Sequence, residues 1–207
     1  MKIIITLFLT IFCNSAFTFA QSKETELDNS KWNFKVEGDF YFTDPFYILP
    51  IVTADKNWLH LEARYNYEEL KTFSGWIGYN FSGGKQFTYS IIPMAGIVAG
   101  RLTGLSPGLE LELTYWNLEF SSQSEFVFDT EDSENNFYYN WSDLSYSPAE
   151  WLFFGLSAQR TKAYETDLDI QRGMFAGVSF KNIEASVYYF NPGNEDYFFL
   201  LSLSTGF

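Results

Sequence analysis

The chain contains one histidine, and its neighbours suggest acid–base chemistry. His60 lies two residues before Glu62, so both side chains share one face if this segment is a strand. A hairpin would bring Asp39 of the preceding segment close to them. A histidine oriented by a carboxylate can act as a general base in hydrolysis. The competing interpretation is a histidine in an interior polar network. We favour it, because a base is assigned on geometry and one histidine among acids does not supply that geometry.

Other charged residues fall on the same kind of polar face. We expect the following side chains to point into the interior of the fold: Lys35, Glu37, Asp39, His60, Glu62, Arg64, Glu110, Glu112, Lys181 and Glu184. Charges of both signs can pair and fill an interior, because isolated buried charges are costly. They can also line a water-filled channel. Acids outnumber bases in this set, so such a channel would prefer cations.

Two acidic runs offer oxygen atoms that a hard divalent cation could bind. They are "DTEDSE" at 129–134 and "ETDLD" at 165–169. Neither has the glycine spacing of a calcium-binding loop. Acidic runs in exposed loops usually only interact with water. We therefore predict two solvated loops, no metal site and no cofactor.

The polar face belongs to strands, because apolar residues recur at every second position along most of the chain. In the first segment, Phe34 and Val36 alternate with Lys35 and Glu37. We predict ten strands, at 32–43, 59–67, 73–81, 86–102, 109–128, 137–146, 152–159, 171–180, 183–189 and 197–207. Two segments leave the strand count open. The segment 109–129 would become two strands if it is broken at 121–122, and the segment 137–146 is ambiguous. If either is misread, the number of strands would be twelve or eight. Strands of about ten residues suit a tilted crossing of a lipid bilayer.

The predicted connections alternate in length. One set is tight, at 68–71, 104–108, 147–150 and 181–182, and the other is longer and more polar, at 44–57, 129–136, 161–169 and 191–196. The short "SGGK" at 82–85 is the exception within the longer set. Short periplasmic turns and longer outer loops are typical of bacterial outer-membrane barrels. An even number of strands then places both termini in the periplasm.

The first twenty residues have the features of a secretory signal peptide. Lys2 precedes an apolar run, and Thr18 and Ala20 put small residues before a predicted cut at Gln21. We predict a signal peptide at 1–20, export through the Sec pathway, and a barrel domain at 21–207. The single cysteine, Cys13, lies within the signal, so disulfides cannot hold the exported domain together.

Composition excludes some partners and favours others. With 26 acidic against 13 basic residues, the chain is a poor partner for nucleic acid. Aromatic residues make up 21% of the chain, which suits a membrane protein, because Trp and Tyr settle at lipid–water interfaces. The expected fold class is therefore an all-β, antiparallel up-and-down transmembrane barrel. A soluble sandwich or a lipocalin-like barrel has the same alternation, but its outer face would carry more bulk than the many Gly and Ser of the polar face.

The sequence closes on "NEDYFFLLSLSTGF", with apolar residues at alternate positions and Phe207 in last place. This stretch resembles the C-terminal signature of bacterial outer-membrane β-barrel proteins, although Thr205 stands where that class often has an apolar residue. The resemblance implies a Gram-negative outer membrane, contact with its lipid, and Phe207 as a signal for the barrel assembly machinery. It singles out no functional family.

Three functions fit such a barrel. The first is a non-enzymatic, porin-like barrel that is structural or a narrow cation-preferring channel for small solutes or ions. The second is an outer-membrane hydrolase using His60 and nearby carboxylates. The chain resembles the omptin proteases in its predicted ten strands and its acids near a histidine, but no omptin motif matches residue by residue. Lipase-like enzymes of this membrane place their sites toward lipid, whereas His60 falls on the opposite face. The third is a surface protein that binds or adheres through its outer loops. We predict the first.

Overall fold

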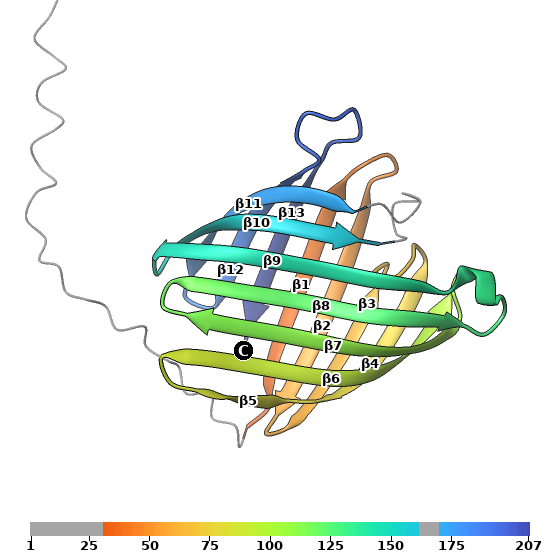
Figure 1. Ribbon diagram of the computed structural model, residues 1–207, viewed down its shortest axis with the longest axis horizontal. Helices are drawn as coiled ribbons and strands as arrows, with labels where there is room; N and C mark the ends of the chain where they lie inside the picture. Colours follow the sequence, from red (N-terminus) through yellow and green to blue (C-terminus); the bar gives the residue numbers. More distant parts are fainter. Residues whose placement is uncertain (1–30, 162–169) are drawn as a thin grey trace, which may run out of the picture.

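The computed structural model describes residues 31–161 and 170–207 (Figure 1). The predicted signal peptide and the acidic run 165–169 lie outside these residues. The strands are β1 (Asn33–Phe42), β2 (Tyr47–Lys56), β3 (Leu59–Tyr65), β4 (Thr72–Tyr79), β5 (Phe81–Gly84), β6 (Phe87–Gly100), β7 (Gly104–Tyr115), β8 (Leu118–Asp129), β9 (Phe137–Ala149), β10 (Leu152–Arg160), β11 (Gln171–Phe180), β12 (Ile183–Phe190) and β13 (Phe198–Gly206). A short 3₁₀ turn, η1 (Ser133–Asn135), precedes β9. The described residues include no helix that is both long enough and apolar enough to cross a membrane.

The strands form a closed antiparallel barrel (Figure 1). Each strand pairs with its neighbours in the sequence, and β13 pairs with β1 to join the two ends of the sheet. β4 and β5 are separated only by Asn80 and both pair with β6, so they act as one interrupted strand. The barrel therefore has twelve strands. The sequence pattern predicted about ten, with eight or twelve as the alternatives if a segment was misread.

One additional strand lies in the segment 44–57, which the sequence pattern predicts to be a long loop. β2 has apolar side chains on both faces, with Leu49 and Ile51 buried and Ile48 and Val52 toward the outside. The polar–apolar alternation that identifies a half-buried strand is therefore missing from this segment. The loop prediction was wrong because this part of the barrel interior is itself apolar.

The other additional strand comes from 109–128, which divides into β7 and β8. The turn lies at Trp116 and Asn117, not at Ser121–Ser122. Trp116 adopts a left-handed backbone conformation with φ of 55°, which is uncommon for a bulky residue. The predicted turn 104–108 is instead the beginning of β7.

Twelve strands also explain the connections. At the end of the barrel where β1 begins and β13 ends, every connection spans two residues: 57–58, 85–86, 116–117, 150–151 and 181–182. We call this the turn end. At the opposite end, the loop end, the connections are 43–46, 66–71, 101–103, 130–136, 161–170 and 191–197. The short "SGGK" connection is no longer an exception, because its turn lies at the turn end with the other short connections. The connection 66–71, predicted to belong to the tight set, lies at the loop end.

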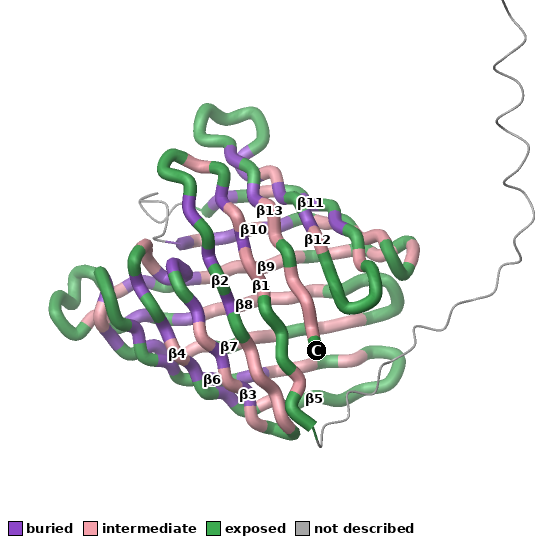
Figure 2. The backbone as a smooth tube through the Cα atoms, turned by 180° about the vertical axis from the view of Figure 1, so that it is seen from behind, coloured by how far each residue is buried: buried purple, intermediate pink, exposed green. Residues whose placement is uncertain are grey.

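Side chains alternate between the two surfaces of the barrel wall. Figure 2 shows buried and exposed positions following one another along the strands. The outer surface is apolar, with residues such as Phe73, Ile97 and Leu156 exposed. The inner surface is polar toward the turn end, whereas toward the loop end large apolar side chains pack together beside a few buried polar ones, such as Gln159 and Gln171. This division sets the shape of the candidate site.

Candidate luminal site

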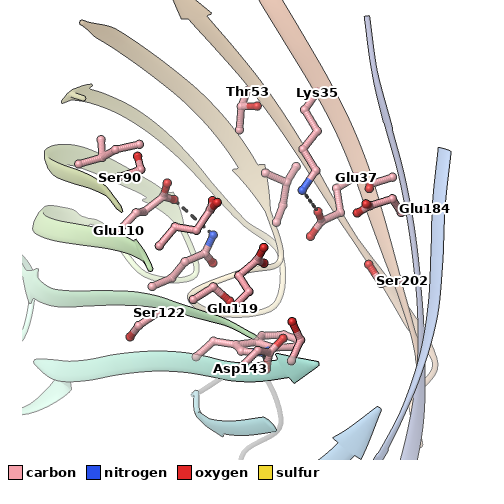
Figure 3. A pocket seen from close by; sticks show the side chains of 18 of the residues that line it. Lys35, Glu37, Thr53, Ser90, Glu110, Glu119, Ser122, Asp143, Glu184 and Ser202 are labelled. Atoms are coloured by element: carbon pink, nitrogen blue, oxygen red, sulfur yellow. Dashed lines mark hydrogen bonds and ion pairs between the residues drawn. The ribbon is translucent and has the colours of Figure 1, made fainter. Parts of the chain in front are cut away.

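A cavity of about 780 Å³ occupies the part of the barrel interior nearer the turn end. Its acidic lining residues are Glu37, Asp39, Asp55, Glu62, Glu110, Glu112, Glu119, Asp143, Glu150 and Glu184. The basic groups of its lining are Lys35, Lys56 and, when protonated, His60. Figure 3 shows labelled carboxylates reaching into this space from several sides, among them Glu110, Glu119 and Glu184. Acidic side chains therefore outnumber basic ones in the cavity lining.

Serine side chains line much of the rest of the cavity. They come from most of the wall: Ser82, Ser90, Ser121, Ser122, Ser145, Ser147, Ser179, Ser186, Ser202 and Ser204. Their small volume leaves the space open, and each hydroxyl can both donate and accept a hydrogen bond.

The cavity ends at a packed apolar layer toward the loop end. We call this the closing layer; it consists of Tyr41, Tyr47, Leu49, Tyr67, Val98, Leu102, Val127, Phe137, Tyr139, Phe190, Phe198 and Leu200. Val127, Phe190 and Leu200 are 0% exposed, so water does not reach them. The lumen is thus a cup that is closed on its loop side.

The connection 66–71 folds inward and completes this layer. Asn66 holds its shape by accepting from the Lys71 amide at 2.7 Å and donating to the Ile48 carbonyl at 2.8 Å. Tyr67 then packs on the Tyr139 ring at 4.6 Å between centroids, and its hydroxyl donates to Gln123. Burial raises the pKa of the Glu68 carboxyl above its ordinary value, an effect that Arg64 opposes.

Arg64 is the centre of a buried ion-pair network beneath the closing layer. Its Nε and Nη2 donate to both oxygens of Glu62 at 2.7 and 2.9 Å. Nη1 donates to Glu125 at 2.9 Å and Nη2 to Glu110 at 3.3 Å. The guanidinium also lies over the Tyr67 ring, 4.2 Å from its centroid. This arginine joins β3 to β7 and β8 across the interior.

His60 belongs to the edge of the same network. Its Nδ1 is 2.8 Å from Asp55 Oδ1, and its Nε2 lies 3.4 Å from Glu62 and 3.9 Å from Glu110. These partners are carboxylates, not the hydroxyl nucleophile that a hydrolytic base would activate.

A metal ion could in principle use three of these groups. Ligand atoms of His60, Glu62 and Glu110 lie within 4.8 Å of one another. Arg64, however, already binds both oxygens of Glu62 and reaches Glu110. A positive guanidinium between the acids disfavours a second cation there.

Part of the cavity wall is aromatic and carries an acid that the sequence pattern did not single out. Asp143 accepts from the Trp141 indole at 2.8 Å and from the Tyr188 hydroxyl at 3.0 Å. The two rings meet edge to face, with centroids 5.7 Å apart. The sequence pattern did not identify Asp143, because the segment 137–146 has aromatic residues on both faces. It did not identify Glu119, because Glu119 lies beside a turn that was not recognised. The slip in alternation near Trp116 was the signal that could have revealed this turn.

The structure places most of the expected interior residues together. Eight of them line the cavity: Lys35, Glu37, Asp39, His60, Glu62, Glu110, Glu112 and Glu184. Arg64 is buried next to it. Lys181 differs, because it lies in the turn between β11 and β12, with its ammonium 5.5 Å from the Phe180 ring centroid. Of the first acidic run, Glu131 and Glu134 are exposed in the 130–136 loop.

The predicted assembly residue lies at the seam of the barrel. Phe207 exchanges two backbone hydrogen bonds with Phe34, both 2.9 Å long. The two rings stack with centroids 5.9 Å apart. The last residue therefore extends the pairing of β13 with β1.

Comparison with known proteins gives a likeness of fold. No protein-family model matches the chain, and no curated protein sequence matches it. A solved structure described as "KdgM porin in complex with disordered oligogalacturonate" is similar, with a TM-score of 0.57, 13% identity, and coverage of 84% of this chain and 99% of that one. A second structure, "KdgM porin", has a TM-score of 0.55, 12% identity and the same coverage. The chain thus has the fold of a porin-like outer-membrane barrel.

Proposed function

We propose that the chain is a non-enzymatic barrel of a Gram-negative outer membrane and a narrow, cation-preferring channel for small solutes. The observation that carries the proposal is an acidic, serine-lined cavity inside a closed barrel. The fold shared with porins supports it.

The outer surface supports contact with lipid. Large apolar side chains cover it, and exposed aromatic residues stand at or next to each turn of the turn end: Trp58, Phe87, Trp116, Trp151 and Phe180. Such a girdle is expected where a barrel meets the lipid–water interface. An aqueous exterior would instead favour polar side chains.

The two kinds of connection support an orientation in the membrane. Outer-membrane barrels have short periplasmic turns and longer outer loops. We therefore place the turn end and both termini in the periplasm. Export by residues 1–20 and recognition of Phe207 by the assembly machinery belong to the same proposal.

The sign of the cavity supports a preference for cations. Ten lining carboxylates face two lysines and one histidine. The neighbouring porin was solved with oligogalacturonate. That ligand is an anion, and the acidic lumen of this chain would repel it. Cations, by contrast, would be concentrated there.

Conduction requires the closing layer to open, and the connection 66–71, which carries Tyr67, can move without breaking a strand. We expect the wild-type protein to be mostly silent in a planar bilayer. Tyr67→Ala, which removes the ring packed on Tyr139, should produce discrete current steps. In a KCl gradient, the reversal potential should show a preference for K⁺ over Cl⁻.

Tyr65→Ala is the matched control, because Tyr65 lies two residues away on the lipid-facing side and is 42% exposed. It should behave as wild type. A Tyr67→Ala barrel that inserts but stays silent, or one that prefers Cl⁻, would overturn the channel proposal and favour a purely structural barrel.

A further inference from the structure

The cavity contains carboxylates that the protein itself leaves without a cation. Among the described residues, Arg64 forms ion pairs with Glu62, Glu110 and Glu125, and Lys35 lies 2.7 Å from Glu37. Neither Asp39 nor Asp143 forms an ion pair within the described part of the chain. Asp39 is buried and Asp143 is half-buried. A charge removed from water without an opposite charge is costly, so a cation would stabilise both carboxylates.

Asp39 is the clearest case. It lies in β1 next to the closing layer and is 3% exposed. Its Oδ1 is buried and has no hydrogen-bond partner among the described residues, although it belongs to the cavity lining. Most buried acceptors in proteins are satisfied, so this oxygen points to a donor supplied from outside the chain.

Asp143 provides a second acceptor, bonded to Tyr188, whose pairing partner Leu200 belongs to the closing layer. Trp141 and Tyr188 each donate to one of its oxygens, which fixes the carboxylate against two aromatic rings. Aromatic faces attract organic cations, and carboxylates accept their N–H groups. We call Asp39, Asp143, Trp141 and Tyr188 the blind-end group.

A second tier of acids lies nearer the turn end. Asp39 pairs in register with Ser202, whereas Glu184 pairs with Ser204, two residues further along β13 and so nearer the turn end. Two residues of a strand span about 6.6 Å. Figure 3 shows Glu119 and Glu184 reaching into the cavity in this region. An extended chain of four methylenes between two ammonium groups matches such a spacing.

We infer that the cup binds a linear polyamine, with one ammonium group at the blind-end group and another at the tier of Glu119 and Glu184. Each primary ammonium has three N–H donors, which the carboxylates and the serine hydroxyls can accept. A single quaternary ammonium fits less well, because the acids are spread along the cavity and the rings do not enclose one point. This inference rests on the proposed function, since it names the solute class of that channel.

Isothermal titration of the refolded protein with spermidine tests the inference. We expect saturable binding of one spermidine per chain. Asp39→Asn and Asp143→Asn should each weaken it about tenfold or more, because each removes a charge-assisted hydrogen bond. Ser186→Phe, which fills the cavity without changing its charge, should abolish it. Glu134→Gln, which removes an equal charge from an exposed loop, should leave it unchanged.

Circular dichroism of each variant establishes that the barrel has folded. The absence of saturable binding, or equal binding by Asp39→Asn, Asp143→Asn and wild type, would overturn the inference. Complete displacement of spermidine by an equal concentration of Mg²⁺ would do so too, because it would reveal a general attraction of cations. The two proposals fail separately. A barrel that binds spermidine but never conducts loses only the channel, and a cation-selective barrel that ignores spermidine loses only the polyamine site.

Discussion

Arg64→Met should destabilise the barrel far more than the loss of an exposed charge. Arg64 is 2% exposed, and its guanidinium donates to Glu62, Glu110 and Glu125. Methionine fills much of the same space but leaves these acids without their cation. Removing one partner of a buried ion pair typically costs about 3–5 kcal/mol, and the lost contact with the buried Tyr67 ring adds about 2 kcal/mol. Because such contributions are not additive, we expect a total of about 3–5 kcal/mol.

Urea unfolding of the protein in lipid vesicles, followed by tryptophan fluorescence, measures this loss. Arg101→Met is the matched control, since Arg101 is half exposed and lies 3.8 Å from Glu69, where an ion pair is worth about 1 kcal/mol or less. The double variant Arg64→Met with Glu125→Leu should recover part of the stability by removing one uncompensated charge. If Arg64→Met unfolds within about 1 kcal/mol of wild type, as expected for an exposed pair, the network does not hold β3 to β7 and β8.

Three further changes test other parts of the molecule. Gly96→Leu should lower stability by about 1–3 kcal/mol, because a Cβ at this position would collide with the Trp76 ring, and a lower urea midpoint checks this. His60→Ala should change no hydrolysis of ester or phospholipid substrates, whereas an activity lost with the imidazole would restore the hydrolase hypothesis. Phe207→Ser should reduce the amount of protein recovered in the outer membrane, measured by fractionation, while Phe180→Ser, an equally exposed aromatic, should not; equal recovery would remove the assembly role of Phe207.

The fold was most predictable where the barrel interior is polar. Along β1 and β3, charges such as Glu37 and Glu62 alternate with outward apolar residues, so period two identified both strand and face. Where the interior is apolar, as along β2, a strand has apolar side chains on both faces, so its sequence shows no polar–apolar alternation. The turn at Trp116 and Asn117 carries neither glycine nor proline, so Asn117 was its only turn-favouring residue.

The site was only partly predictable for a different reason. Strand faces are local properties, and they placed His60, Glu62 and Glu110 on the inside. Which acids meet Arg64 depends on the stagger of strands that are far apart in the sequence, such as β3 and β8. Likewise, nothing local indicates that Tyr67, in a connection between strands, folds back and packs on Tyr139.

The seam between β1 and β13 has a consequence for how the molecule reaches its native state. Its partners, such as Lys35 and Gly206, are separated by almost the whole described chain, so the contact that closes the barrel has the greatest loop-closure cost. Contacts of this range slow folding. Until they form, β1 and β13 each present an unpaired backbone edge that can add a strand from another molecule. Aggregation should therefore compete with closure during refolding, and dilute protein should give the higher yield.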